Sequence, residues 1–202
     1  ATATVHSESD LRRLLNVSCL GTLPFCIQKR RRKGQRSDIN ILSTGTPSAY
    51  VEAIRLIRTR LERQMEGKKV LMVTSSVSGE GKSTVAANLA VSMALKGKKV
   101  VLVDCDLRNP TIGKIFRVKG KFPGLVSALQ GTSRIEESMC EVMERNSPVG
   151  LTLLLGGEPN SKLVEVLSSE TMKNVVDQLR EQFDVVILDT PPSAILVDAM
   201  ML

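Results

Sequence analysis

The sequence predicts an α/β fold in which helices flank a mostly parallel central sheet. From residue 69 onward, short apolar runs alternate with amphipathic segments of helical period, which is the pattern of strands joined by helices. The chain has 202 residues but no Trp, one Tyr and four Phe. Its core must therefore be built from Val, Leu, Ile, Met and Ala, as suits helices packed on a parallel sheet. At this length we expect one substantial domain and a flanking segment.

Hydrophobic period and capping signals place the expected elements in order. Ahead of a polar linker at 35–45, residues 8–15 have the pattern of a short helix and residues 17–23 that of a strand. In chain order we then expect a helix at 46–66, a strand at 70–74, a helix at 83–96, a strand at 100–103, helices at 124–130 and 133–144, a strand at 150–155, a helix at 161–182 and a strand at 184–188. The first two strands of this series must be parallel, because a helix joins them.

A glycine-rich loop joins the strand at 70–74 to its helix. Residues 76–83, Ser-Val-Ser-Gly-Glu-Gly-Lys-Ser, match the P-loop pattern G-x-x-x-x-G-K-[ST], except that a serine replaces the first glycine. The glycines let consecutive N–H groups turn toward phosphate oxygens, and the start of the helix adds its own N–H groups. A plain Gly/Ser-rich turn is the alternative, which the strand before the loop and the helix after it disfavour. We therefore predict ATP and Mg²⁺ as ligands, held by Ser78, Gly79, Glu80, Gly81, Lys82, Ser83 and Thr84.

Three aspartates lie directly after apolar strands. Asp104 and Asp106 are two residues apart at the end of the strand at 100–103, so in an extended chain they point to the same side. Two like charges so placed call for a cation or a proton between them, although capping or a turn is an alternative explanation of either residue. Asp189 follows 185–188 in the Walker B arrangement, which holds Mg²⁺ or its water. Open α/β sheets bind ligands at this edge, so we expect these aspartates beside the P-loop.

Charge and cysteine content narrow the functional classes. The formal charge of +7 is concentrated in a basic block, Lys29–Arg36, which is typical either of a solvated linker or of contact with an anionic membrane surface. Nucleic acid is disfavoured, because no aromatic residues interleave with these charges. The cysteines are far apart and His6 is the only histidine, so neither a zinc site nor a disulfide framework is expected. Neither a bilayer-spanning stretch nor a signal peptide is evident, which indicates a reduced, cytosolic compartment.

These motifs, taken in order, resemble the cytoplasmic kinase domain of the bacterial protein-tyrosine kinases that control capsule and exopolysaccharide export. The resemblance is carried by Asp-x-Asp-x-Arg at 104–108 and Asp-Thr-Pro-Pro at 189–192, each after an apolar strand, with further matches at 124–131 and 156–163. The related MinD/ParA ATPases carry an extra lysine near the start of the P-loop. Here that position is Val77, which favours the kinase branch of this MinD/ParA-like P-loop NTPase fold.

The resemblance implies a role for each site residue. Lys82 acts catalytically on the phosphates, Ser83 and Asp106 bind Mg²⁺, Asp189 binds it through water, and Asp104 is the base toward the incoming tyrosine hydroxyl. Phosphoryl transfer asks mainly for positioning and charge neutralisation, with a carboxylate near the attacking oxygen. The residue types at these positions therefore agree with the chemistry that the resemblance implies.

The helix at 46–66 carries a second motif of the family. The triplet Glu52, Arg55 and Arg58 resembles the E-x-x-R-x-x-R helix that packs neighbouring subunits into a ring, and helical spacing places it on a face separate from that of Ile54, Ile57 and Leu61. A solvated charged face is the alternative. The resemblance thus implies a homo-oligomer.

The resemblance also implies a domain organisation. Residues 1–45 are expected to form a juxtamembrane-like segment with the basic linker, because 8–24 resembles the stretch after the second membrane helix in members fused to their membrane activator. Residues 46–202 are expected to form a P-loop kinase domain that is truncated at its C-terminus, with an incomplete sheet, because the family's tail of acceptor tyrosines has no counterpart here. Tyr50 fits a structural or interface role better than an acceptor role. The implied location is the cytoplasmic face of the membrane.

The leading interpretation is an ATP-dependent tyrosine kinase that autophosphorylates between subunits and regulates polysaccharide polymerisation and export. Its implied partners are other copies of the chain, the membrane activator with its polysaccharide co-polymerase region, and anionic lipid at Lys29–Arg36, but no nucleic acid. Two alternatives remain. One is a MinD/ParA-type ATPase that dimerises with nucleotide and binds a surface. The other is a non-catalytic, ring-forming assembly module in which the nucleotide is only structural.

Overall fold

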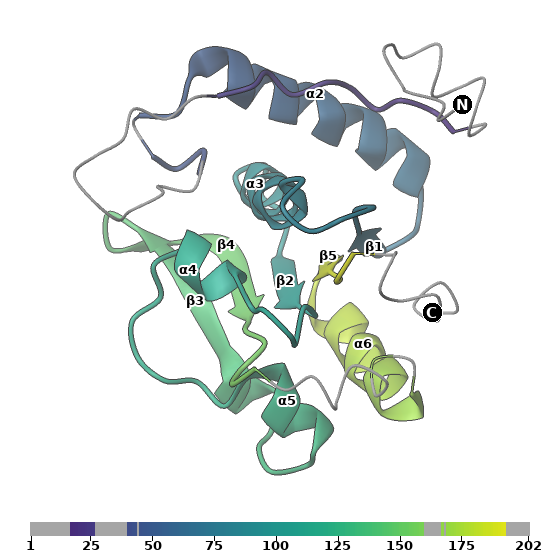
Figure 1. Ribbon diagram of the computed structural model, residues 1–202, viewed down its shortest axis with the longest axis vertical. Coiled ribbons are helices and arrows are strands. Elements are labelled where there is room, and N and C mark those ends of the chain that lie inside the picture. Colours follow the sequence, from purple (N-terminus) through teal and green to yellow (C-terminus); the bar gives the residue numbers. More distant parts are fainter. Residues whose placement is uncertain (1–16, 27–39, 44, 160–166, 168, 193–202) are drawn as a thin grey trace.

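The computed structural model describes residues 17–26, 40–43, 45–159, 167 and 169–192. Its elements, in chain order, are α2 (Ser48–Met65), β1 (Val70–Val73), α3 (Lys82–Ala94), β2 (Val100–Asp104), α4 (Ile112–Ile115), α5 (Gly124–Leu129), the 3₁₀ helix η1 (Glu136–Ser138), β3 (Met139–Glu144), β4 (Ser147–Leu154), α6 (Glu170–Gln182) and β5 (Val185–Asp189). The helix expected at 8–15 and the basic block lie outside the described residues. Figure 1 shows the sheet between two helical layers, with α2 and α3 on one side and α5 and α6 on the other.

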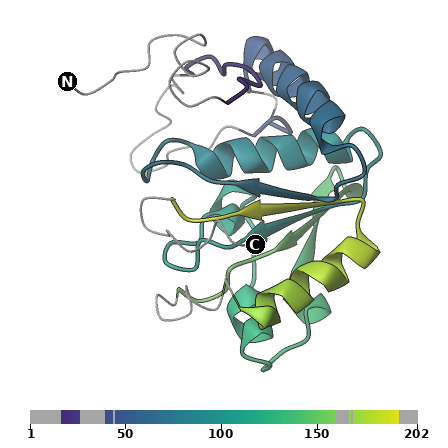
Figure 2. The ribbon, with the colours of Figure 1, turned by 90° about the vertical axis from the view of Figure 1, so that its right-hand side faces the viewer.

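A five-stranded sheet in the order β1-β5-β2-β4-β3 forms the centre of the fold. Strands β1, β5, β2 and β4 pair in parallel, and β3 runs antiparallel to β4 at one edge. The expected mostly parallel sheet is therefore confirmed. The register pairs Val73 with Asp189, and Asp189 with Asp104. The carboxyl ends of β1, β5 and β2 thus lie side by side, and Figure 2 shows these strands pointing to the same side of the molecule.

Strand β2 is covered on both faces, because successive side chains of a strand point in opposite directions. Val100 and Leu102 pack in the hydrophobic cluster that includes α2, α3 and α4, whereas Val101 and Val103 pack in the cluster that includes α5 and α6. All four side chains are fully buried. This double burial explains why the strand reads as an uninterrupted apolar run, and why its first polar residue marks the edge of the sheet.

Helix α2 forms an outer layer on α3 (Figure 1). Its apolar face is buried as expected, at Ile54, Ile57 and Leu61. The expected charged face is interrupted, because Arg58 is only 8% exposed and its Nη1 donates to Ser92 of α3, to the backbone oxygen at 3.1 Å and to Oγ at 3.2 Å. Arg58 stands one helical turn after Ile54, so its aliphatic stem follows the buried face. The alternative of a solvated charged face therefore does not hold for Arg58.

The described residues before α2 also pack on the domain. Residues 17–26 run along α2 without forming a strand (Figure 1), so the strand expected at 17–23 was wrong. Leu20 and Leu23 nevertheless pack against the cluster that includes α2 and α3, and Arg60 Nη1 donates to the backbone oxygen of Leu20 at 3.0 Å. In the part of the chain that the structure describes, every helix is too short or too polar to cross a bilayer.

The helix expected at 133–144 was wrong as well. This stretch forms η1 and the edge strand β3, which a tight turn links to β4. Arg145 and Asn146 in this turn have φ angles of 49° and 66°, and positive φ at both central residues is typical of a type I′ hairpin turn. The helix expected at 161–182 corresponds to α6, and residues 160–166 and 168 lie outside the described part.

Candidate functional site

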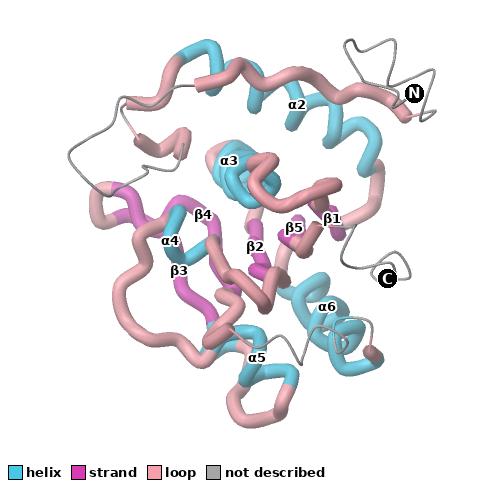
Figure 3. The backbone as a smooth tube through the Cα atoms, in the orientation of Figure 1, coloured by secondary structure: helices cyan, strands magenta, loops and turns pink. Residues whose placement is uncertain are grey.

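Three loops meet at the carboxyl edge of the sheet. The P-loop follows β1, the aspartate pair ends β2, and Asp189 ends β5. Figure 3 shows these loops gathered in front of the strand ends, next to α3. The strand ladders continue into the loops, because the amide of Cys105 donates to Asp189 O at 2.9 Å and the amide of Thr190 donates to Val73 O at 3.0 Å. The sheet therefore fixes the backbone from which the candidate site residues project.

The P-loop has the backbone geometry that phosphate binding requires. Gly79 and Gly81 have φ angles of 89° and 91°, which side-chain-bearing residues rarely adopt, and α3 begins directly afterwards at Lys82. The Glu80 carboxylate accepts hydrogen bonds from the amides of Ser76 at 2.8 Å and Val77 at 3.2 Å. It thereby closes the first half of the loop. The exposed residues 78–80 and the free N–H groups of the α3 start are left facing outward.

Lys82 lies inside the site and contacts the Walker B aspartate. Its Nζ is 2.6 Å from Asp189 Oδ1 and 3.0 Å from Ser83 Oγ, and the two charged side chains are 7% and 0% exposed. A buried ion pair of this kind compensates two charges that would each be costly alone. The structure thus brings Lys82 and Ser83 of the P-loop together with Asp189 of the Walker B motif, although the direct contact of Lys82 with Asp189 was not predicted.

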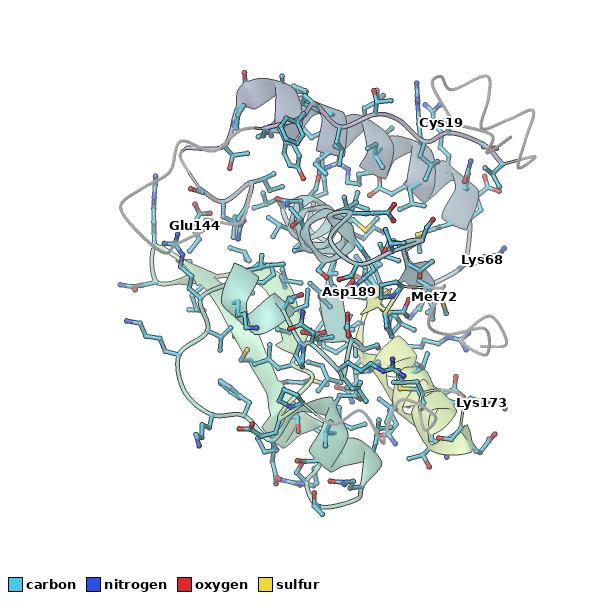
Figure 4. All side chains as sticks on the ribbon, in the orientation of Figure 1. Cys19, Lys68, Met72, Glu144, Lys173 and Asp189 are labelled. Atoms are coloured by element: carbon cyan, nitrogen blue, oxygen red, sulfur yellow. The ribbon has the colours of Figure 1, made fainter. Side chains whose placement is uncertain are left out.

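Asp189 has an oxygen that is suited to a hard cation. Figure 4 places this residue near the centre of the molecule, at the end of β5. Burial raises the pKa of its carboxyl, an effect that Lys82 and a hydrogen bond from Ser83 oppose. Its Oδ2 is buried and has no hydrogen-bond partner among the described residues. An orphaned carboxylate oxygen beside a serine hydroxyl fits Mg²⁺, which takes one or two carboxylates together with phosphate oxygens and water.

The phosphates of a nucleotide would have to complete such a metal site. Among the described residues, no group of three or more His, Cys, Asp or Glu side chains is placed to hold a metal ion by itself. That arrangement fits P-loop proteins, in which the ion is shared between a serine or threonine, an aspartate and the nucleotide. The residues present therefore fit an ion that binds with ATP.

Asp104 is buried and strongly hydrogen-bonded. Its Oδ2 accepts the amides of Thr111 at 2.8 Å and Ile112 at 2.9 Å, whereas its Oδ1 accepts only the amide of Asp106 at 3.3 Å. Burial raises the pKa of this carboxyl to about 7, and the negative charge of Asp189 adds to the effect. Asp104 thus caps the start of α4, one of the alternatives that the sequence left open. Its Oδ1 keeps acceptor capacity for a further partner.

Asp106 lies within electrostatic range of both other aspartates. Its charge raises the pKa of Asp104 and of Asp189, and its own Oδ1 accepts the amide of Asn109 at 3.2 Å. Asp106 is half-buried, unlike the two fully buried aspartates. The three carboxylates therefore form one cluster beside Lys82, with Asp106 on its solvent side.

Sequence reasoning missed the support that surrounds this cluster. A Cβ at Gly156, which follows β4, would lie 3.3 Å from Asp104 O and 3.0 Å from Pro110, so the loop after β4 rests directly on the aspartate segment. The Gly156-Gly157 pair was visible as a motif, but nothing in its pattern indicated this contact. The predicted interface residues Glu52 and Arg55 lie elsewhere, as an exposed ion pair of 2.6 Å on α2.

Known proteins resemble the chain in sequence. A profile of the AAA domain matches residues 67–202. Tyrosine-protein kinase YwqD of Bacillus subtilis is 39% identical over 179 residues, which is 86% of this chain and 72% of that protein. Tyrosine-protein kinase CpsD of Streptococcus pneumoniae serotype 4 is 33% identical over 144 residues, 71% of this chain and 62% of that protein. The chain thus spans between three fifths and three quarters of these two relatives.

Solved structures resemble it in fold. The kinase domain of Escherichia coli tyrosine kinase ETK aligns with a TM-score of 0.81 and 25% identity, over 98% of this chain and 78% of that one. The septum site-determining protein MinD of Pyrococcus horikoshii, complexed with Mg-ADP, aligns with a TM-score of 0.52 over 61% of this chain and 49% of that one. The MinD/ParA-like P-loop fold and the kinase branch are both confirmed. The chain therefore belongs to the family of bacterial tyrosine-protein kinases.

Proposed function

We propose that the chain transfers the γ-phosphoryl group of Mg-ATP to a tyrosine hydroxyl of a protein substrate. The observation that carries the proposal is the cluster of Lys82, Ser83 and Asp189, with Asp104 at the end of the neighbouring strand β2 and Asp106 in the loop that follows it. Such an arrangement offers cationic, hydroxyl and carboxylate groups at one point of the sheet edge. Phosphoryl transfer needs these groups and little covalent chemistry from the protein.

The P-loop is the part that would hold the triphosphate. The backbone N–H groups of Ser78–Thr84 surround the phosphates, and Lys82 neutralises charge on the β- and γ-phosphates once its contact with Asp189 is exchanged for phosphate oxygens. Ser83 Oγ, Asp106 and Asp189 Oδ2 are the groups that would hold Mg²⁺. When bound, this ion neutralises phosphate charge. Support comes from the left-handed glycines, the free α3 start and the orphaned carboxylate oxygen.

Asp104 is proposed as the base for the acceptor. A pKa near 7 suits a general base that must take up a proton at neutral pH, and Oδ1 is the oxygen with spare acceptor capacity. In the proposed step the tyrosine oxygen bonds to the γ-phosphorus, the bond from that phosphorus to the bridging oxygen of ADP breaks, and the tyrosine proton passes to Asp104. The amides of Thr111 and Ile112 hold the carboxylate in place.

The wider role proposed is regulation of capsular or exopolysaccharide polymerisation and export at the cytoplasmic face of the membrane. Trans-autophosphorylation in a ring would use Glu52 and Arg55, which are exposed on α2, while Arg58 would act by holding that helix on α3. The Lys29–Arg36 block would contact anionic lipid, next to the membrane activator. Nucleic acid is not proposed as a partner.

The decisive experiment combines labelled ATP, Mg²⁺ and a tyrosine-bearing peptide. The full chain should yield alkali-stable phosphotyrosine, and a Lys82→Ala variant should yield none. Because Lys82→Ala leaves Asp189 buried without its cation, Ser83→Ala serves as a second variant that keeps the ion pair, and Lys96→Ala, an exposed lysine after α3, serves as the matched control. Equal labelling by wild type and Lys82→Ala would refute the proposal. Release of phosphate without phosphotyrosine would favour a positioning ATPase instead.

A further inference from the structure

A run of exposed basic residues follows the aspartate cluster. We call residues 108–121 the basic rim segment. It contains only basic charges, at Arg108, Lys114, Arg117, Lys119 and Lys121, and the sequence has no Asp or Glu from 107 to 135. All of these basic side chains are exposed, and none forms an ion pair with a described carboxylate. Elsewhere on the described surface basic side chains do pair within their own helices, as Arg180 does with Asp177 at 3.0 Å.

We propose that the basic rim segment binds acidic residues that flank the acceptor tyrosine of a protein substrate. The inference rests on the proposed kinase function, because it names the substrate class of that same site. It assigns the specificity for the acceptor to charges that lie next to the catalytic carboxylates, outside the nucleotide-binding loop.

The position of the segment supports this assignment. Asp106 Oδ1 accepts the amide of Asn109 at 3.2 Å, and Asp104 Oδ2 accepts the amides of Thr111 and Ile112. The first part of the segment is therefore tied to the two aspartates by backbone hydrogen bonds. In Figure 1 the loop after α4 curves away from β2, outside β3, and continues to α5. A peptide bound along this segment would therefore reach the two aspartates at residues 108–112, where the segment begins.

One of the charges occupies a position that helices usually give to glycine. Arg117 follows α4 with a φ of 53°, and the amides of Arg117 and Val118 donate to Lys114 O and Gly113 O at 3.1 and 2.9 Å. This pairing closes the helix end as a Schellman-type cap, in which the left-handed residue is commonly glycine. An arginine is conformationally unfavourable at this left-handed position. Its positive charge therefore points to a role in binding and not in stabilising the fold.

The acceptor has to come from outside the described domain surface. Tyr50 is the only tyrosine of the chain, and it is 3% exposed within the cluster that includes α2 and α3. The proposed acceptor hydroxyl therefore belongs to a segment outside the described residues. In an extended peptide each residue spans about 3.3 Å, so acidic residues three to five positions from the tyrosine reach about 10 to 17 Å along the rim. Lipid headgroups share the negative charge, but a bilayer presents no tyrosine.

The test compares substrate peptides that differ only in charge. Three peptides of equal length carry one tyrosine flanked by Glu, by Gln or by Lys at the same positions, and kcat/KM is measured for each with the full chain at low and at raised ionic strength. We expect wild type to prefer the Glu peptide over the Gln peptide by about tenfold, because several screened ion pairs each contribute a few-fold. The preference for the Glu peptide should shrink as ionic strength rises.

A Lys114→Glu/Lys119→Glu variant should instead prefer the Lys peptide. A Lys96→Glu/Lys98→Glu variant, with exposed lysines in the loop between α3 and β2, is the matched control and should behave as wild type.

Each outcome decides something. Equal kcat/KM on the Glu and Gln peptides, or the same reversal in the Lys96/Lys98 control, overturns the inference. If wild type phosphorylates none of the peptides, the proposed function fails. Binding of a fluorescently labelled Glu peptide, with Phe in place of Tyr, is then measured by anisotropy and tests the basic rim segment independently of activity. Salt-sensitive binding that Lys114→Glu/Lys119→Glu abolishes supports the surface. If this peptide does not bind but phosphatidylglycerol vesicles bind in a charge-dependent way, the inference is overturned and the segment's partner is an anionic membrane.

Discussion

Replacing Arg58 by alanine tests whether this arginine stabilises the fold or only an oligomer. Its Nη1 donates to the backbone oxygen and to the Oγ of Ser92, at 3.1 and 3.2 Å, and its side chain is 9% exposed. Hydrogen bonds from charged groups contribute about 1.5–3 kcal/mol each. A single nitrogen shared between two acceptors counts as one such bond, about 2 kcal/mol, and the buried stem adds about 1 kcal/mol more. Glu62 Oε2, at 3.7 Å and on a side chain that is 39% exposed, adds little.

The assay is urea unfolding of Arg58→Ala, with Arg55→Ala as the matched control on the same helix. With a slope of about 2 kcal/mol per molar urea, the loss of about 3 kcal/mol moves the unfolding midpoint down by about 1.5 M. Arg55 is 57% exposed and pairs with an exposed glutamate, so its removal should lower stability by about 0.5 kcal/mol or less. Equal midpoints for the two variants would refute the assignment of Arg58 to the α2–α3 contact. Sedimentation of both variants separates any effect on assembly from the effect on stability.

Three further predictions concern Asp104, Gly124 and Tyr50. Burial raises the pKa of Asp104 from 3.8 to about 7, so the folded state holds this proton more tightly than the unfolded chain does. The free energy of unfolding should therefore fall as pH rises from about 4 to 7, and it should fall less in Asp104→Asn. Parallel plots of unfolding free energy against pH for wild type and variant would contradict this prediction. Gly124→Ala should lower the free energy of unfolding by more than about 3 kcal/mol in thermal unfolding, because its Cβ would lie 2.4 Å from Gly157 at a φ of 76°. The control Gly131→Ala, at a φ of 70° in open space, should lower it by about 1 kcal/mol. Similar losses of stability in the two variants would count against the steric argument. Tyr50→Phe should leave peptide phosphorylation unchanged, since the phenol is buried on α2, and loss of phosphotyrosine would show that this residue takes part.

The sequence was informative where a buried strand meets a loop. The apolar run of β2 and the pattern of residues 76–83 determine both the parallel order and the side of the sheet on which the loops gather, because parallel strands end at the same edge. The hairpin of β3 and β4 was missed for an opposite reason. Its strand lies at the edge of the sheet, where half-exposed residues leave a mixed pattern, and its turn uses Arg145 and Asn146 in place of the Asn-Gly that usually signals such a turn.

Within the site, residue types were easier to predict than contacts. The spacing of motifs indicated a P-loop lysine and three aspartates, but the 2.6 Å pair of Lys82 and Asp189 joins residues 107 positions apart in the chain. The capping of α4 by Asp104 was foreseen only as an alternative, because an aspartate at a strand end carries the same signal whether it caps or catalyses. Arg58 was misplaced because a long side chain at the border of a helical face is able to turn toward either solvent or core.

Helix α3 explains how an exposed loop keeps a defined shape. Residues 86–94 of α3 are buried, with the sheet on one side and α2 on the other. Two contacts fix its position from outside: Arg58 binds Ser92, and Asn88 accepts the amide of Ile41 at 2.8 Å while donating to Thr84 O at 2.7 Å. A preorganised site should not rearrange when charge develops during the reaction. By fixing α3, these contacts hold the phosphate-binding loop at the start of the helix in one conformation. Composition places a boundary at residue 45, but packing continues across it into the segment that precedes α2.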